Sequence, residues 1–282
     1  MTVSRSSWHG LKTQRPEWQP WLAVVEEILP EAGGPGWEAA VPSQINAQRA
    51  EVPLLSGAAI GVPAGSVRHL LERLVRVASR DTSPKLTSVK STLSINPDVL
   101  ILFTASLSQD GDRVSAIADA SGADAEALQA MVALLCVPFL QACNRRWASA
   151  VSASWSQGYC PVCGAWPAFA EVRGIERSRC LRCGRCGSAW PAPALRCPYC
   201  RTGHHHELVE LVPEKHGSHD VVNACVRCHG FVKTLTVLQG CPPDAVMLED
   251  LASVDLDIAA IEQGYVRPSG PGYRLDVKVT AR

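Results

Sequence analysis

Four pairs of cysteines, each pair spaced by two residues, constrain this 282-residue chain more than any other feature of its sequence. In such a pair both sulfurs can face one point across a tight turn, and two turns together supply the four thiolates of a tetrahedral metal site. Buried free thiols that merely fill a core would not recur in four matched pairs. The sequence therefore predicts two metal sites with these ligands: Cys160, Cys163, Cys183, Cys186, Cys197, Cys200, Cys225 and Cys228.

The order of the pairs predicts which cysteines share an ion. The stretches 164–182 and 201–224 are each long enough to form a β-hairpin between two metal-binding turns. We therefore expect the first two pairs to form one site and the last two the other. An interleaved arrangement, in which the first pair joins the third, remains open on spacing alone. Gly164 and Gly187 directly follow a second cysteine, where a left-handed backbone helps to close the turn.

The chemistry of four thiolates limits what these sites can do. Tetrahedral sulfur coordination suits zinc and mononuclear iron alike, so the residues do not choose between these metals. With four protein ligands, neither site keeps an open position for water or substrate, which argues against hydrolytic metal catalysis. A thioredoxin-like redox role would use one pair at the start of a helix in a βαβ unit, and the sequence has no such pattern.

Four cysteines lie outside these pairs. Cys180 could form an overlapping pair with Cys183, so the sequence alone leaves its role ambiguous. The other three lie in or beside apolar helical patterns, where core packing explains them: Cys136, Cys143 and Cys241. The histidines near the pairs, His204–His206 and His229, are expected to be solvated or to support the ligands rather than to bind metal.

The composition predicts a soluble globular protein, with 46% hydrophobic and 19% charged residues. Its 27 basic and 27 acidic residues balance, so no overall field favours nucleic acid or anionic lipid. The start of the chain lacks the pattern of an export signal, which predicts a cytoplasmic protein. The apolar stretch Ala130–Leu140 is shorter than the roughly 20 residues of a membrane-spanning helix, so we expect no membrane insertion.

Apolar periodicity predicts helices in the first half of the chain. One helix is expected over 65–80, with Ser66 as its N-cap, and another over 124–147, with a kink at Pro138. Six prolines within residues 1–60 predict that the helices there are short.

The second half has strand-like runs at Glu207–Val212 and Phe231–Leu238. Beyond them, apolar residues at steps of four and three predict one helix from Met247 to about Gly264. The expected fold class is α+β and multidomain. Its parts are an α-helical N-terminal domain (1–155), two small rubredoxin-like or zinc-ribbon-like metal modules (156–193 and 194–240), and a C-terminal helix with a tail (241–282).

In these motifs the chain resembles the FdhE family of bacterial formate dehydrogenase accessory proteins. The resemblance rests on CPVCG at Cys160, on the Cys183 pair with Trp190 downstream, on CPYC at Cys197 and on ACVRCHGFVKTL at Ala224. It continues through EDLASVDLDIAAIEQGYVR and covers roughly residues 155–268. In the family an aromatic residue usually stands at the position of Cys180, so the chain departs from the pattern there.

The resemblance implies a cytoplasmic, non-enzymatic maturation factor with two rubredoxin-like modules that bind iron. It also implies a partner, the catalytic subunit of a respiratory formate dehydrogenase, which is bound before export. Two other functions remain open: a rubredoxin-like electron-transfer protein and a zinc-ribbon nucleic-acid-binding protein. The cysteine-rich segment has few aromatic residues and only a slight positive excess, so we expect no nucleic-acid partner.

Overall fold

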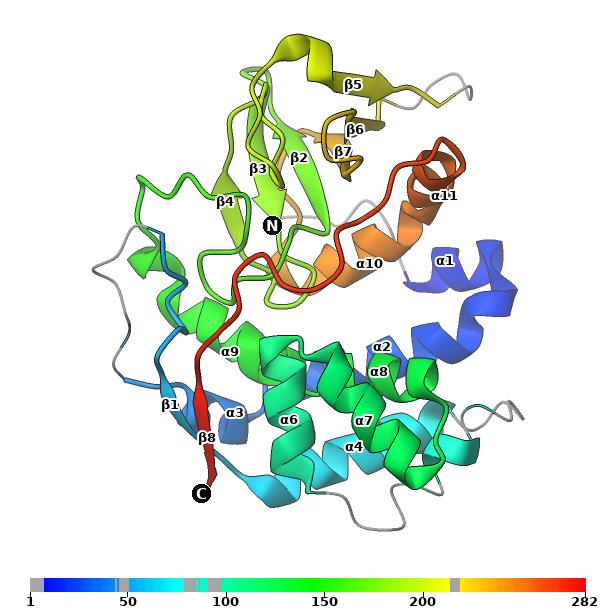
Figure 1. The fold of residues 1–282 in the computed structure, drawn as a ribbon, viewed down its shortest axis with the longest axis vertical. Helices are drawn as coiled ribbons and strands as arrows, with labels where there is room; N and C mark the ends of the chain where they lie inside the picture. The colour runs from blue at the N-terminus through cyan, green and yellow to red at the C-terminus, as the bar shows by residue number, and fades with distance from the viewer. Residues whose placement is uncertain are drawn as a thin grey trace. The chain divides into compact units, whose positions relative to one another are not determined.

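The chain forms two compact units in a computed structural model that describes residues 8–43, 45, 51–78, 85, 87–90, 98–213 and 219–282 (Figure 1). We call the first the sheet unit; it comprises the described residues among 47–54 and 148–273. The second, the helical unit, comprises those among 8–46, 55–147 and 274–282. The fold therefore combines a helical N-terminal part with a β-rich, cysteine-rich part that is followed by C-terminal helices, as the sequence predicted.

The sheet unit contains one six-stranded sheet with the strand order β4-β3-β2-β7-β6-β5. Its strands are β2 (Phe169–Arg173), β3 (Ser178–Arg182), β4 (Ala189–Pro191), β5 (Leu208–Leu211), β6 (Val221–Cys225) and β7 (Phe231–Val237). The two strand-like runs predicted from sequence correspond to β5 and β7, so both predictions are confirmed.

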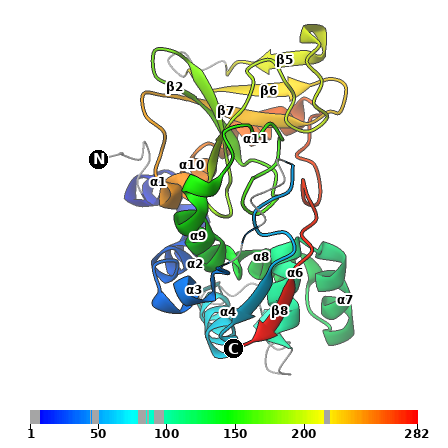
Figure 2. The ribbon, with the colours of Figure 1, turned by 90° about the vertical axis from the view of Figure 1, so that its left-hand side faces the viewer.

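One parallel pairing joins the two halves of this sheet. Strands β2, β3 and β4 form an antiparallel meander, and β5, β6 and β7 form another. Strand β2 then pairs in parallel with β7, with Phe169 opposite Lys233 and Arg173 opposite Val237. Figure 2 shows β7 lying between β2 and β6. The two three-stranded halves therefore form one continuous hydrogen-bonded sheet.

Two helices, not one, follow the sheet: α10 (Val246–Ala252) and α11 (Val254–Glu262). The prediction of one continuous helix is wrong because the backbone breaks at Ser253, whose hydroxyl donates hydrogen bonds to the carbonyls of Glu249 and Asp250. Val246 and Ala260 pack against apolar residues of the sheet, whereas Ile261 from the predicted stripe is 58% exposed. A 3-10 turn, η4 (Pro243–Ala245), leads into α10.

The helical unit is built mainly from short helices, which the prolines predicted for residues 1–60. They are α1 (Trp8–Gln14), η1 (Pro16–Trp18), α2 (Gln19–Glu31), α3 (Pro35–Ala40), α4 (Ala64–Ala78), α6 (Val99–Ser108), α7 (Gly111–Ser121), α8 (Ala125–Leu134) and α9 (Val137–Trp147). Strand β1 (Ala59–Val62) pairs in parallel with β8 (Lys278–Ala281), so the end of the chain returns to this unit. Its core includes Trp37, which stacks on Phe103 at a ring distance of 6.2 Å.

Two helix boundaries test the sequence predictions directly. Helix α4 begins at Ala64, because the carbonyl of Pro63 already accepts hydrogen bonds from the Ser66 and Val67 amides. Ser66 therefore lies in the first turn and is not the N-cap. In place of the single helix predicted over 124–147 with a kink at Pro138, the structure has two helices, since α8 ends at Leu134 and α9 begins at Val137, just before this proline.

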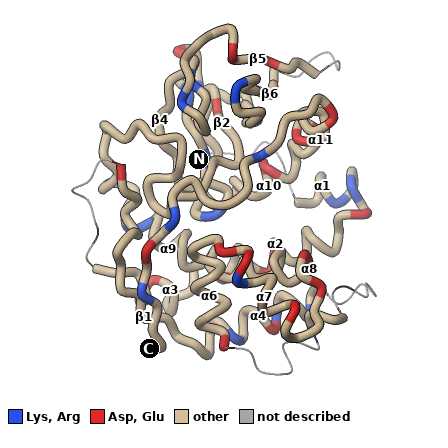
Figure 3. Tube along the Cα trace, in the orientation of Figure 1, with Lys and Arg blue, Asp and Glu red and all other residues tan. Residues whose placement is uncertain are grey.

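One run of the described chain, Ala125–Ala150, is long and apolar enough to cross a membrane by length and composition. However, 67% of its most apolar window is buried inside the protein, as expected for a core helix. Figure 3 shows Lys and Arg positions interspersed with Asp and Glu positions in each unit, in keeping with the zero net charge.

Candidate metal centres

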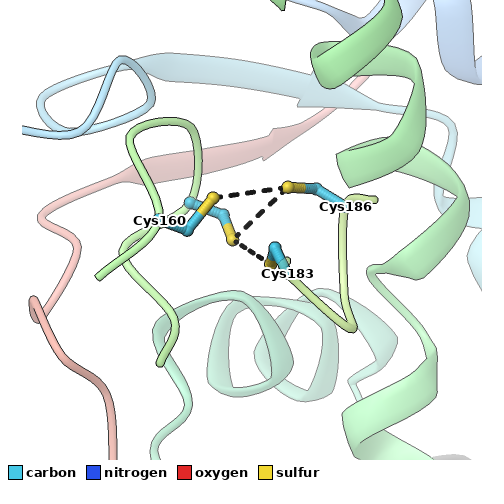
Figure 4. Close-up of side chains that lie close together, drawn as sticks. Cys160, Cys183 and Cys186 are labelled. Atoms are coloured by element: carbon cyan, nitrogen blue, oxygen red, sulfur yellow. Dashed lines mark hydrogen bonds between the residues drawn. The ribbon is translucent and has the colours of Figure 1, made fainter. Parts of the chain in front are cut away.

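The first cluster brings together Cys160, Cys163, Cys183 and Cys186, from turns that precede β2 and follow β3. The sulfurs of Cys160 and Cys186 are 3.4 Å apart, and those of Cys163 and Cys183 are 3.5 Å apart. Figure 4 shows Cys160, Cys183 and Cys186 with their side chains turned toward one another. The hairpin of β2 and β3 thus places two turns face to face.

The second cluster brings together Cys197, Cys200, Cys225 and Cys228. The sulfurs of Cys197 and Cys228 are 3.6 Å apart, and those of Cys200 and Cys225 are 3.7 Å apart. The cysteines are therefore grouped in sequential order, and the interleaved arrangement does not occur.

These separations fit a tetrahedral ion. Four sulfurs at about 2.3 Å from a central ion would lie about 3.8 Å from one another. A disulfide would need a separation of about 2.05 Å, and all twelve cysteines are free. Both clusters could therefore hold one metal ion each, and the donor set suits iron and zinc equally.

The same backbone hydrogen bonds close all four turns. The amide of the first cysteine bonds to the carbonyl five residues later, as in Cys160 to Ala165 and Cys197 to Thr202. Equivalent bonds join Cys183 to Ser188 and Cys225 to Gly230. In the first cluster, the amide of Val162 also donates to the Cys160 sulfur at 3.4 Å. The local sequence thus preorganises each pair before any ion binds.

The residue directly after the second cysteine has a left-handed backbone in every turn. The four residues and their φ angles are Gly164 at 71°, Gly187 at 76°, Arg201 at 63° and His229 at 54°. The sequence prediction rested on the two glycines alone. Arg201 and His229 occupy the equivalent positions, and their place after a Cys-x-x-Cys pair was the signal that could have identified them.

Burial and hydrogen bonds shift the pKa values of the first cluster in opposite directions. Burial raises the pKa of the Cys160 and Cys186 thiols well above the ordinary value, whereas hydrogen bonds from Cys160 and Cys163 lower the pKa of Cys183 well below it. Four buried thiolates would repel one another strongly, and a cation at their centre provides the compensating charge. The site thus fits an ion better than it fits four free thiols.

The remaining cysteines lie outside the two clusters. Cys180 is half-buried on β3, opposite Glu171 and Pro191. Cys136 and Cys143 are buried in the helical unit. Cys241 packs in the core beneath the sheet, where burial raises its pKa to about 12. The three histidines His204–His206 are exposed, and the rings of His204 and His205 each lie 5.6 Å from that of His206.

Sequence reasoning missed a buried ion pair beside the first cluster. Glu171 and Arg182 lie on paired strands, with 3.1 Å between Oε2 and Nη1. The same guanidinium donates to the Gly187 carbonyl at 3.3 Å, and the Cys241 amide donates to Oε1 of Glu171 at 2.9 Å. These bonds connect one metal-binding turn to the sheet and to the segment before α10.

A second missed network surrounds Lys233 on β7, whose side chain is completely buried. Its Nζ lies 2.7 Å from carboxylate oxygens of both Asp250 and Asp257. Arg267 pairs with the same two aspartates, at 3.1 Å and 2.6 Å. The network ties α10 and α11 to the sheet. A lysine within a strand that contains no other charged residue was the signal in the sequence.

Together, the sheet and its two closed clusters define a protein with two tetracysteine clusters that could each hold a metal ion. Comparison with known proteins gives its relatives. The chain is 30% identical to an FdhE homolog from Aquifex aeolicus over 118 residues, which cover 40% of each protein. It is 32% identical to an FdhE homolog from Stutzerimonas stutzeri over 114 residues, or 39% of this chain and 36% of that protein. The resemblance to the FdhE family is therefore confirmed.

A third relative, the FdhE homolog of Pseudomonas aeruginosa, is 30% identical over 126 residues, which are 43% of this chain and 40% of that protein. The matched segments span less than half the length of these relatives. The crystal structure of the FdhE protein from Pseudomonas aeruginosa aligns with 90% of this chain, with a TM-score of 0.48 and 19% identity. No family model matches the sequence.

Proposed function

We propose that this protein is a cytoplasmic accessory factor for a formate dehydrogenase and that it binds the catalytic subunit of that enzyme before export. The proposal rests on two closed tetracysteine clusters together with similarity to FdhE proteins. The family resemblance links such chains to the maturation of formate dehydrogenase, and the geometry supports a binding role.

The clusters favour binding over catalysis. Each cluster offers four thiolates to one ion, so the ion has no coordination position left for substrate or water. We therefore propose that the protein is not an enzyme and that its metals stabilise the surface that the client recognises. By the family resemblance, the metal is iron in both sites, with zinc as the alternative.

The proposal is tested by deleting the gene and measuring respiratory formate oxidation. We expect activity to be lost while the transcript of the catalytic subunit persists. The intact gene and a Cys180→Ser variant should both restore activity, because Cys180 belongs to neither cluster. A variant carrying Cys160→Ser and Cys163→Ser should not restore it.

Capture experiments test the partner. A tagged copy of the full chain should retain the catalytic subunit from cytosolic extract. Normal formate oxidation in the deletion strain, together with recovery of DNA or RNA on the tagged protein, would instead support a zinc-ribbon nucleic-acid binder. Metal analysis and a visible spectrum of aerobically purified protein separate red ferric sites from colourless zinc sites.

A further inference from the structure

The two clusters differ in their access to solvent. All four cysteines of the first cluster are 0% exposed. In the second cluster Cys197 and Cys225 are buried, but Cys200 and Cys228 are only partly covered. Two of the four cysteines that would hold the second ion are therefore partly accessible to solvent.

Backbone from distant segments seals the first cluster. A Cβ atom at Gly164 would lie 2.7 Å from the carbonyl oxygen of Tyr273, and one at Gly187 would lie 2.5 Å from that of Pro243. The Pro161 carbonyl also accepts a hydrogen bond from the Leu54 amide at 2.8 Å. An incoming ligand could reach this ion only if these covering segments moved away.

The equivalent positions in the second cluster are more exposed, although the His229 carbonyl accepts a hydrogen bond from the Val266 amide at 2.8 Å. Arg201 and His229 stand where the first cluster has glycines, and both are exposed. Val226 and Arg227, between the two cysteines of the last pair, are exposed as well. The residues that follow Cys200 and Cys228 therefore face solvent, although Gly158 packs against the Pro198 carbonyl, whereas the equivalent residues of the first cluster are buried under other parts of the chain.

Access matters because an ion leaves a closed four-thiolate site by ligand substitution. An entering ligand must bind the ion while a thiolate departs and takes up a proton, with no change of oxidation state. We propose that the second cluster is an exchange site, at which a thiophilic divalent ion enters and leaves past Cys200 and Cys228, and that the first cluster retains its ion. This inference rests on the proposed function only in taking both clusters as metal sites.

Zinc release from the full chain tests the inference. Protein loaded with two equivalents of Zn²⁺ is mixed with an excess of the chromogenic chelator 4-(2-pyridylazo)resorcinol. We expect one equivalent of zinc to leave at least about tenfold faster than the other. A tenfold difference in rate corresponds to an activation barrier for release that is lower by about 1.4 kcal/mol. Alkylation with iodoacetamide at the end of the fast phase, followed by peptide mapping, should modify the second cluster and spare the first.

Two variants assign the phases independently. A chain with Cys200→Ser and Cys228→Ser should keep one zinc ion and show only the slow phase, whereas Cys180→Ser should keep both phases unchanged. Release of both ions at one rate, or early alkylation of Cys160 or Cys186, would overturn the exchange site. A wild-type chain that binds fewer than two zinc ions would overturn it as well. Failure to capture formate dehydrogenase would overturn the accessory function alone.

Discussion

Gly164 and Arg201 occupy equivalent positions in two metal-binding turns, with φ angles of 71° and 63°. A left-handed backbone costs a residue with a side chain about 1–2 kcal/mol, whereas glycine adopts it freely. At Gly164 the close Tyr273 carbonyl also excludes a Cβ atom. The exposed Arg201 meets only the conformational cost, so it is a site where the protein can be stabilised.

Replacing Arg201 should separate backbone strain from loss of the side chain. We expect Arg201→Gly to be more stable than Arg201→Ala by about 1 kcal/mol in denaturant unfolding of the metal-loaded protein, because both variants lose the charge and only glycine relieves the strain. The reverse substitution, Gly164→Ala, should destabilise the protein. Equal stability of the two Arg201 variants would show that this turn carries no strain.

Removing the buried Lys233 should be costly. Lys233→Met keeps much of the volume but leaves Asp250 and Asp257 with Arg267 as their remaining cation. Breaking a buried pair typically costs about 3–5 kcal/mol. We expect the free energy of unfolding, measured in urea, to fall by an amount near the lower end of this range, because Arg267 partly compensates for the lost lysine. A loss below about 1 kcal/mol would mean that Arg267 alone satisfies both carboxylates.

The ionisation of Glu171 should make the stability of the fold depend on pH. Burial alone would raise the pKa of this carboxyl, but the charge of Arg182, the Cys241 amide and Arg173 outweigh burial and lower it. The pKa of Glu171 is therefore lower in the folded chain than in the unfolded chain. Ionised Glu171 stabilises the fold at pH values above about 4.3, the pKa of an unfolded glutamate. This stabilisation is lost as the pH falls through the lowered pKa of the folded chain.

The matched variant Glu171→Gln isolates this contribution from protonation of the cysteines. The wild type should be more stable than the variant at pH 7, and the difference should shrink below pH of about 4. Thermal unfolding of both proteins across this range is the measurement. A difference that stayed constant down to the lowest pH would show that the charge of Glu171 plays no part.

Metal removal should act on the sheet unit first. Because ion binding at a tetracysteine site contributes directly to folding, its loss should expose the amides of β2, β3, β6 and β7 to hydrogen exchange. The amides of α4, α6 and α8 should remain protected, since their core includes neither cluster. Simultaneous loss of protection in both units would show that they unfold cooperatively.

Cys180→Ser should keep both metals. Its half-buried side chain lies on β3, outside either cluster, although it belongs to the Cys180, Cys183 and Cys186 run. Elemental analysis should therefore give two ions per chain in the variant and the wild type. Loss of one equivalent would show that Cys180 exchanges with a neighbouring cysteine as a ligand.

Much of the fold and both cysteine clusters could be predicted from local sequence patterns. The spacing of the cysteine pairs led to both clusters, because a Cys-x-x-Cys turn is fixed by its own backbone hydrogen bonds. The short helices and the two strand runs likewise followed from prolines and β-branched residues. The break between α10 and α11 was not predicted, because the apolar pattern suits one helix. The hydroxyl of Ser253 competes for backbone carbonyls within that pattern.

Relationships between distant residues were not predictable. The parallel pairing of Phe169 with Lys233 depends on contacts that no local pattern encodes. The partners of Lys233 likewise come from α10, α11 and the segment that contains Arg267. The burial of one cluster and the exposure of the other follow from which distant segments fold over each turn.

The parallel pairing of β2 with β7 also sets an order of assembly during synthesis. The ligands of the first cluster leave the ribosome well before residues 231–237, so the first metal site can close while the second is still incomplete. Until β7 emerges, the edge of β2 has no neighbouring strand and can pair with other chains. The nascent protein therefore passes through a half-sheet stage that lasts until β7 has left the ribosome.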